Sequence, residues 1–198
     1  STVVLRDITE RKTSEEARTL LAREVDHRAK NALAVAQALV GLTRADTVED
    51  FAEAIRGRIS SLARAHSLLS QSQWRGAPLD QLICDEILPY AKDSQLSLSG
   101  SPVSCRAGAV QSLSLLFHEL ATNAVKHGHA RRVSVELWGE TGAFLRICDD
   151  GDGFDHSLLR VRRGHGLNDM TERTESLGGE LKITSVPQQG TTVEVMIP

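Results

Sequence analysis

Two stretches near the N-terminus place apolar residues at alternating steps of three and four, which is the period of an amphipathic helix. In the first, from Arg11 to about Gly41, this stripe consists of Leu21, Val25, Ala32, Val35, Leu39 and Leu42. In the second it consists of Phe51, Ile55, Leu62, Ala65 and Leu69. Only the short polar segment 43–47 separates them, and two long helices joined so tightly pack antiparallel. We therefore predict a helical hairpin.

The ends of these helices follow from capping chemistry. Ser14 is a candidate N-cap of the first helix, although a helix that continues from Ile8 through Thr13 fits equally well. Either Asp46 or Thr47 can cap the second helix. A lone hairpin leaves apolar surface, so we expect it to pair with a second hairpin or with the neighbouring domain.

Beyond Gln71 helical and alternating patterns intermix, after a linker signal at 74–78. The helical patterns cover 79–91, 106–127 and 166–178. Alternating apolar positions predict strands at 95–99, 132–138, 143–149, 180–186 and 191–197. The fold class is therefore α+β, a two-helix hairpin followed by a two-layer α/β domain with largely antiparallel strands.

Composition narrows the class of protein. The 198 residues are 40% hydrophobic and 25% charged, as in ordinary globular proteins. The sequence has no run of 18 apolar residues that could span a membrane, and it has no secretory signal. Its net charge of −3 gives no basic surface of the kind that binds nucleic acid. Three scattered cysteines suit a reducing compartment, so we expect a cytoplasmic protein. The chain starts without Met on a strand-like segment, 2–6, so we expect a piece of a longer protein.

Four short polar or glycine-rich segments, which we call islands, contain side chains that could carry chemistry. The first lies in the predicted helix 106–127. Glu119, Asn123 and Lys126 follow one another at i, i+4 and i+7, so a carboxylate, an amide and an ammonium share one helical face. A solvated helix face with charge pairs is the competing interpretation for these three residues alone.

Three further islands follow. Asp149–Phe154 ends an apolar strand, and its glycines allow close backbone approach while an aspartate can accept from an exocyclic amine. A plain acidic turn is the alternative. Gly164–Leu167 opens a helix, where free N–H groups favour phosphate. Gly190–Thr192 enters the final strand.

The order and spacing of the four islands, over residues 74–198, resemble the N, G1, G2 and G3 boxes of the Bergerat ATP-binding fold. Histidine kinases, Hsp90, type II topoisomerases and MutL share that fold as the GHKL superfamily. The resemblance implies ATP and Mg²⁺ as cofactors, with Asn123 on the metal and Asp149 on the adenine amino group. The remaining nucleotide contacts that it implies are Lys126, His127, Gly151, Gly153, Arg163, Gly164, Gly166, Leu167, Thr191 and Thr192. Residues 154–163 would form a lid, and its arginines, Arg160, Arg162 and Arg163, either reach phosphate or are surface charge.

The hairpin carries a second resemblance. Its first helix contains Asp26–Asn31, which looks like the phosphoacceptor box of the HWE and related HisKA_2 sensor kinases. The runs 57–66 and 74–79 also resemble the HWE pattern, and His118 opens the N box. One departure is that HWE kinases carry Trp-x-Glu at the G1 box, where this chain reads Ile-Cys-Asp at 147–149. Residues 7–12 resemble the exit of PAS sensor domains.

Together these resemblances imply the transmitter of a sensor histidine kinase. His27 would be autophosphorylated and pass its phosphoryl group to an aspartate of a response-regulator receiver domain. Asp26 or Glu119 would assist the imidazole, and Asn31, one turn beyond His27, would orient water in a phosphatase reaction.

The implied organisation is the end of a PAS-type sensor domain and linker at 1–13, the phosphoacceptor hairpin at 14–72 and the ATP-binding domain at 73–198. A homodimer through the hairpin would form a four-helix bundle. The alternatives are a GHKL-type ATPase or anti-sigma serine kinase, and a nucleotide-binding scaffold without phosphotransfer.

Overall fold

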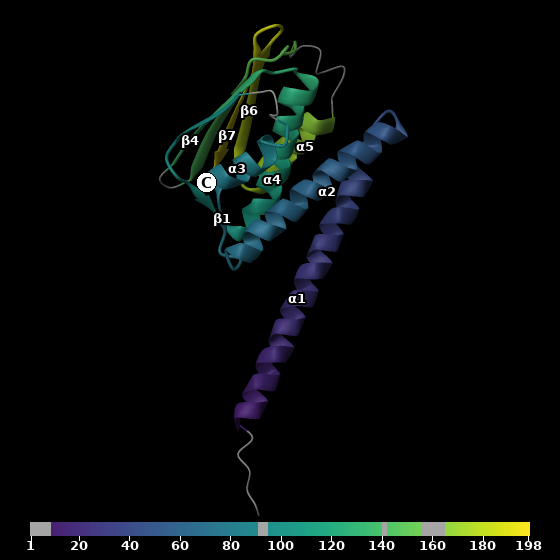
Figure 1. Cartoon of the computed structure of the whole chain (residues 1–198), viewed down its shortest axis with the longest axis vertical. Coiled ribbons are helices and arrows are strands. Elements are labelled where there is room, and N and C mark those ends of the chain that lie inside the picture. Colours follow the sequence, from purple (N-terminus) through teal and green to yellow (C-terminus); the bar gives the residue numbers. More distant parts are fainter. Residues whose placement is uncertain (1–8, 91–94, 140–141, 156–164) are drawn as a thin grey trace, which may run out of the picture. The chain divides into compact units, whose positions relative to one another are not determined.

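The structure is a computed structural model that describes residues 9–90, 95–139, 142–155 and 165–198 (Figure 1). It divides into two compact units, Ser1–Thr43 and Arg44–Pro198. The first unit contains helix α1, Thr9–Leu42. Because α1 runs unbroken past Ser14, the structure agrees with the continuous-helix alternative. The strand predicted at 2–6 lies outside the described residues.

Helix α2, Val48–Gln71, opens the second unit. Thr47 is its N-cap, because the Thr47 hydroxyl accepts a hydrogen bond from the Asp50 backbone N–H at 3.1 Å. Three residues of the predicted apolar stripe, Leu62, Ala65 and Leu69, are buried. They pack this helix against the rest of the unit. Within the described residues, no helix is long and apolar enough to span a membrane.

A five-stranded sheet forms the centre of this unit. Its strands are β2 (Gln95–Gly100), β4 (Arg132–Trp138), β5 (Ala143–Asp149), β6 (Glu180–Val186) and β7 (Gly190–Ile197). Their order is β2-β4-β5-β7-β6, with β2 parallel to β4 and the other pairs antiparallel. The prediction of a largely antiparallel sheet in an α+β fold is confirmed.

Three helices cover one face of the sheet: α3 (Leu79–Ile87), α4 (Ala107–Ala121) and α5 (His165–Ser176) (Figure 1). Helix α4 packs on the sheet with one side and on α2 with the other. Apolar residues of α4, including Leu113, Leu116 and Phe117, meet the alternate inward residues of β4, β5 and β7 in one core. The sheet and these three helices form the two layers that the sequence predicted. Helix α2 packs on the side of α4 that faces away from the sheet.

Three local features differ from the sequence prediction. The helix expected over 79–91 ends at Ile87, two residues before Pro89, because a proline has no backbone N–H with which to continue the helical hydrogen bonds. The expected linker at 74–78 contains a two-residue strand, β1 (Ala77–Pro78), which pairs antiparallel with β3 (Ser104–Cys105). The helix expected over 106–127 changes after Ala121 into a π-helical turn, η1 (Thr122–His127). Both β1 and η1 are too short to show in a periodicity that is read over a window of about 11 residues or more, so the sequence pattern could not reveal them.

We predict that truncating a side chain destabilises the protein much more on the face of the sheet that the helices cover than on the other face. Leu145 of β5 is fully buried, whereas Met196 of the adjacent strand β7 is 48% exposed. Leu145→Ala should lower the free energy of unfolding by about 2–5 kcal/mol because it leaves a cavity. Met196→Ala should cost under about 1 kcal/mol. Urea titration of both variants checks this, and equal losses would contradict the assigned faces.

Candidate functional site

The four sequence islands meet around one cavity of about 330 Å³ in the second unit. Its walls come from the end of α4 and η1, from β5 and β7, and from the first turn of α5. Seven of the candidate nucleotide residues line it: Asn123, His127, Asp149, Gly153, Gly166, Leu167 and Thr191. Apolar side chains, including Leu120, Ile147, Val193, Met170 and Ile183, form much of the remaining wall. The cavity is therefore apolar over one part of its wall and polar at Asp149 and Asn123.

Asp149 lies at the end of β5, with a carboxylate whose orientation is fixed by the backbone. Its Oδ1 accepts hydrogen bonds from the N–H groups of Gly151 at 2.9 Å and Thr191 at 3.2 Å. Burial raises the pKa of Asp149, aided by the Asp150 charge, and these two N–H groups oppose the shift. Among the described residues no donor reaches Oδ2, so that oxygen can accept a hydrogen bond from a ligand in the cavity.

Gly151 and Gly153, which follow Asp149, lie so close to other backbone atoms that a Cβ would collide with them. A Cβ on Gly151 would lie 2.4 Å from the Gly128 carbonyl oxygen. Gly153 has a φ of +58°, and a Cβ there would lie 2.1 Å from the carbonyl oxygen of Val186. The loop after β5 is therefore pressed against both η1 and the β6–β7 turn, which shapes the cavity wall.

The other two aspartates of this loop are structural. Asp150 Oδ1 accepts from the N–H groups of Arg132 at 2.7 Å and Arg131 at 2.8 Å. These bonds, chiefly the one from Arg132, lower the pKa of Asp150. Asp152 pairs with His129 at 2.9 Å, on the surface. The acidic-turn interpretation thus describes these two residues, while Asp149 alone faces the cavity.

The carboxylate, amide and ammonium of Glu119, Asn123 and Lys126 do face a common space. All three line a polar hollow of about 350 Å³ between α2 and η1, next to the cavity. Two of them are paired with α2, Glu119 with Arg58 at 2.7 Å and Lys126 with Glu53 at 2.7 Å. The sequence predicted the convergence but not the role of α2 in it.

The remaining predicted site residues fall elsewhere. Thr192 donates to Cys148 Sγ on the sheet face opposite the cavity. Gly164 and the lid arginines, Arg160, Arg162 and Arg163, lie outside the described residues.

The predicted phosphoacceptor segment lies on α1, in the first unit. There Asp26 pairs with Lys30 at 2.6 Å, and Asn31 is exposed. The side chain of His27 is outside the described part of the chain.

Sequence reasoning gave no individual role to a group of buried polar residues beside the site. Glu86 and His118 are buried, and Arg58 is 7% exposed. Burial by itself would raise the pKa of Glu86. The His118 ring, 3.7 Å away, and hydrogen bonds from Arg64 and Ser114 outweigh that effect and hold the pKa below its ordinary value. Arg58 was detectable, because position 58 completes the seam formed by Ile55 and Leu62, where an apolar residue is expected.

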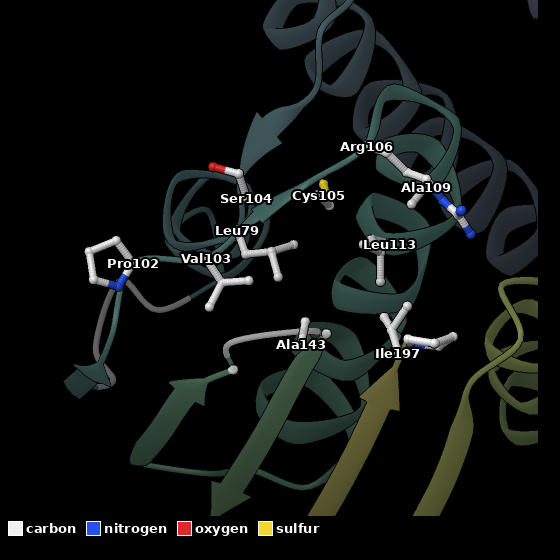
Figure 2. Close-up of a pocket in the computed structure, with 13 residues that line it drawn as sticks. Leu79, Pro102, Val103, Ser104, Cys105, Arg106, Ala109, Leu113, Ala143 and Ile197 are labelled. Carbon is white, nitrogen blue, oxygen red and sulfur yellow. The ribbon is translucent and has the colours of Figure 1, made fainter.

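A hollow of about 500 Å³ at the other ends of β5 and β7 contains none of the candidate residues. Figure 2 shows it between Leu79 and Val103 on one side and Ala143 and Ile197 on the other. This hollow therefore plays no part in the candidate nucleotide site, which lies at the end of the sheet where Asp149 is.

Two families match this chain in succession. Residues 24–102 match the HWE histidine kinases, and residues 108–198 match the histidine kinase-, DNA gyrase B- and HSP90-like ATPases. A blue-light-activated histidine kinase of Rhizobium johnstonii is 42% identical over 108 residues, which are 54% of this chain and 31% of that protein. One of Brucella ovis is 33% identical over 129 residues, 63% of this chain and 26% of that protein. The chain thus spans less than a third of either relative.

Solved structures share the fold at low sequence identity. A blue-light activated histidine kinase of Erythrobacter litoralis has a TM-score of 0.66 at 22% identity, covering 89% of this chain and 58% of that one. The ATP-binding domain of PrrB from Mycobacterium tuberculosis has a TM-score of 0.51 at 21% identity, covering 63% and 97%. At these identities the likeness concerns the fold alone.

The contact at Gly151 generates a prediction with a matched control. Gly151→Ala should lower the free energy of unfolding by about 1–3 kcal/mol, because its Cβ would collide with the backbone of Gly128. Gly108→Ala adds the same methyl group to α4, where nothing lies within 4 Å. It should stabilise the chain by up to about 1 kcal/mol through helix propensity. Urea unfolding of the pair is the measurement, and a neutral Gly151→Ala would refute the close approach.

Proposed function

We propose that this chain is an ATP-dependent histidine kinase which phosphorylates its own His27. Residues 24–102 match the HWE histidine kinases, and residues 108–198 match the histidine kinase-, DNA gyrase B- and HSP90-like ATPases. The observation that carries this proposal is the meeting of four separated sequence islands around one cavity, with Asp149 in its wall.

The cavity suits an adenine base. Asp149 Oδ2 would accept a hydrogen bond from the exocyclic amino group, while the apolar side chains of Leu120, Ile147 and Val193 would contact the purine faces. The volume of about 330 Å³ is in the range of small-molecule sites. Because Oδ1 is already held by two backbone N–H groups, the carboxylate needs no reorientation on binding.

The residues present also fit Mg²⁺ held mainly by nucleotide phosphates. No group of three His, Cys, Asp or Glu side chains that could hold a metal occurs among the described residues. Mg²⁺ usually keeps several waters and binds substrate phosphates with few protein ligands, so a single amide oxygen from Asn123 is sufficient. When bound, Mg²⁺ would neutralise charge on the transferred phosphoryl group.

The phosphates would extend from the cavity toward the first turn of α5. There the N–H groups of Gly166 and Leu167 and the helix dipole favour negative charge, and His127 lines the same cavity. Lys126 could join them, because its pair with Glu53 joins two side chains that are 42% and 58% exposed and so contributes little free energy. Arg163 and Gly164 are expected to complete this end.

In the transfer step, a neutral ring nitrogen of His27 attacks the γ-phosphorus. The bond from the γ-phosphorus to the bridging oxygen breaks, ADP leaves, and the ring proton passes to a carboxylate. Asp26 and Glu119 remain the candidates for that base. Asn31, one turn beyond His27 on α1, is proposed to orient water when phosphate is removed from the partner regulator.

The proposed partners follow from this chemistry. The phosphoryl group of His27 would pass to an aspartate of a response-regulator receiver domain, and a PAS-type sensor domain would precede this segment in the same protein. The exposed apolar side chains of α1, including Leu20, Val25 and Leu33, would support a homodimer. We propose a cytoplasmic location, where ATP and receiver domains are available.

The test of the proposed activity is labelling from γ-labelled ATP. The chain should acquire an acid-labile, base-stable label, and His27→Gln should lose it entirely because no acceptor nitrogen remains. His66→Gln is the matched control, since His66 packs edge-on against Trp74 and should retain the label. An acid-stable, base-labile label would instead favour a serine kinase, and an acid-labile label that survives in His27→Gln would show that another histidine is the acceptor. ATP hydrolysis without label would favour an ATPase.

The raised pKa of Asp149 predicts how adenosine affinity depends on pH. The charged carboxylate is the stronger acceptor, so affinity should fall as pH drops through the pKa of the free site, above the ordinary 3.8. Asp149→Asn should weaken binding by about 1–3 kcal/mol and remove this component of the pH dependence. Calorimetric titration at several pH values measures both effects. Identical profiles for the two proteins would rule out this role of Asp149.

A further inference from the structure

Arg58 is a charged residue in an apolar helical seam. On α2 it continues the spacing of Ile55 and Leu62, which otherwise brings apolar side chains to the contact with α4. Its side chain is only 9% exposed. A buried guanidinium is costly unless it is paired, so its partners show what it does there.

Among the described residues, two carboxylates on different helices pair with Arg58. Arg58 Nε and Nη2 each lie 2.7 Å from Glu119 Oε1 on α4, and Nη2 lies 3.3 Å from Asp169 Oδ2 on α5. The carboxylates of Glu119 and Asp169 are only 13% and 21% exposed, so water screens these pairs weakly. One guanidinium therefore joins α2 to the two helices that border the nucleotide cavity.

Both partners stand next to the proposed reaction centre. Glu119 precedes Asn123 by one helical turn, and Asp169 follows Gly166 by about one turn. A Cβ on Gly166 would lie 3.2 Å from Glu119 Oε2. The Glu119 carboxylate is thus held between Arg58 and the first turn of α5, where the phosphates are proposed to bind.

The local sequence of α2 allows this close approach. A Cβ on Gly57 would lie 2.7 Å from His118 Nε2, so a larger residue at position 57 would have to displace the buried His118 ring or α2 itself. One turn later the hydroxyls of Ser61 and Ser114 lie 2.9 Å apart. These contacts fix the register of α2 on α4 and hold the Arg58 side chain over its partners.

We propose that Arg58 is a positioning residue for phosphoryl transfer, through which α2 fixes the Glu119 carboxylate and the first turn of α5 relative to the reacting phosphate. This inference rests on the proposed kinase function. Arg58 does not line the nucleotide cavity itself. The proposal therefore predicts that α2 affects the rate of phosphoryl transfer and not the affinity for nucleotide.

The test compares Arg58→Gln, Arg58→Lys and the matched control Arg56→Gln, which alters an exposed arginine two residues away. Affinity for ADP is measured by calorimetry, and the rate of His27 labelling is measured at saturating ATP. Arg58→Gln should keep its ADP affinity within about threefold but label about 10- to 100-fold more slowly, as expected when reacting groups are misplaced. Arg58→Lys should recover part of the rate, because an ammonium can pair with one carboxylate but lacks the planar fork that bridges two. Arg56→Gln should match the wild type.

Backbone amide exchange supplies a readout that does not depend on the kinase reaction. Arg58→Gln should speed exchange in the first turns of α5, at 166–170, and leave β5 unchanged. If the wild-type chain takes no label, the kinase proposal fails, and exchange still decides whether Arg58 holds α5.

Three results would overturn the positioning role: unchanged exchange at 166–170, a wild-type labelling rate in Arg58→Gln, or a loss of rate matched by an equal loss of ADP affinity. Should Arg58→Gln not fold, Asp169→Asn removes only the link to α5 and should show the same split between rate and affinity.

Discussion

The burial of α4 on both sides is the constraint on which the rest of the structure depends. A helix between a sheet and a second helix can carry polar groups only where each finds a partner. Ser114 and His118 find theirs on α2 and α3, and Glu119 finds Arg58. Because the same helix leads directly into η1, its packing also sets the position of Asn123 at the cavity.

The site is correspondingly built from rigid parts joined by backbone contacts. Asp149 links the loop after β5 to the start of β7 through its two accepted hydrogen bonds. Gly151 lies against the end of η1. These contacts hold three separated parts of the chain together at the cavity, which favours binding because little ordering remains to be done. The π-helical turn at Asn123 is a feature often found at functional sites.

Much of this could be predicted from the sequence, since periodicity is a local property. Alternation gave the five long strands to within one residue at each end, and the three-four spacing gave α2. The partners of Arg58 could not be predicted, because they lie 61 and 111 residues away in the chain. The two-residue pairing of β1 with β3 leaves no local pattern either. Periodicity showed the apolar stripe of α2 but not which element it contacts, and the structure buries Leu62, Ala65 and Leu69 within the compact unit 44–198.

The central claim of this account is that the cavity beside Asp149 holds an adenine base. Calorimetric titration of the whole chain with ADP and with GDP tests it most directly. ADP should bind at least about tenfold more tightly, because guanine presents an oxygen acceptor where adenine presents its amino donor, and that oxygen would face the Asp149 carboxylate. In Asp149→Asn, whose amide can donate as well as accept, the preference should shrink. Equal affinity of the wild-type chain for ADP and GDP would contradict the account.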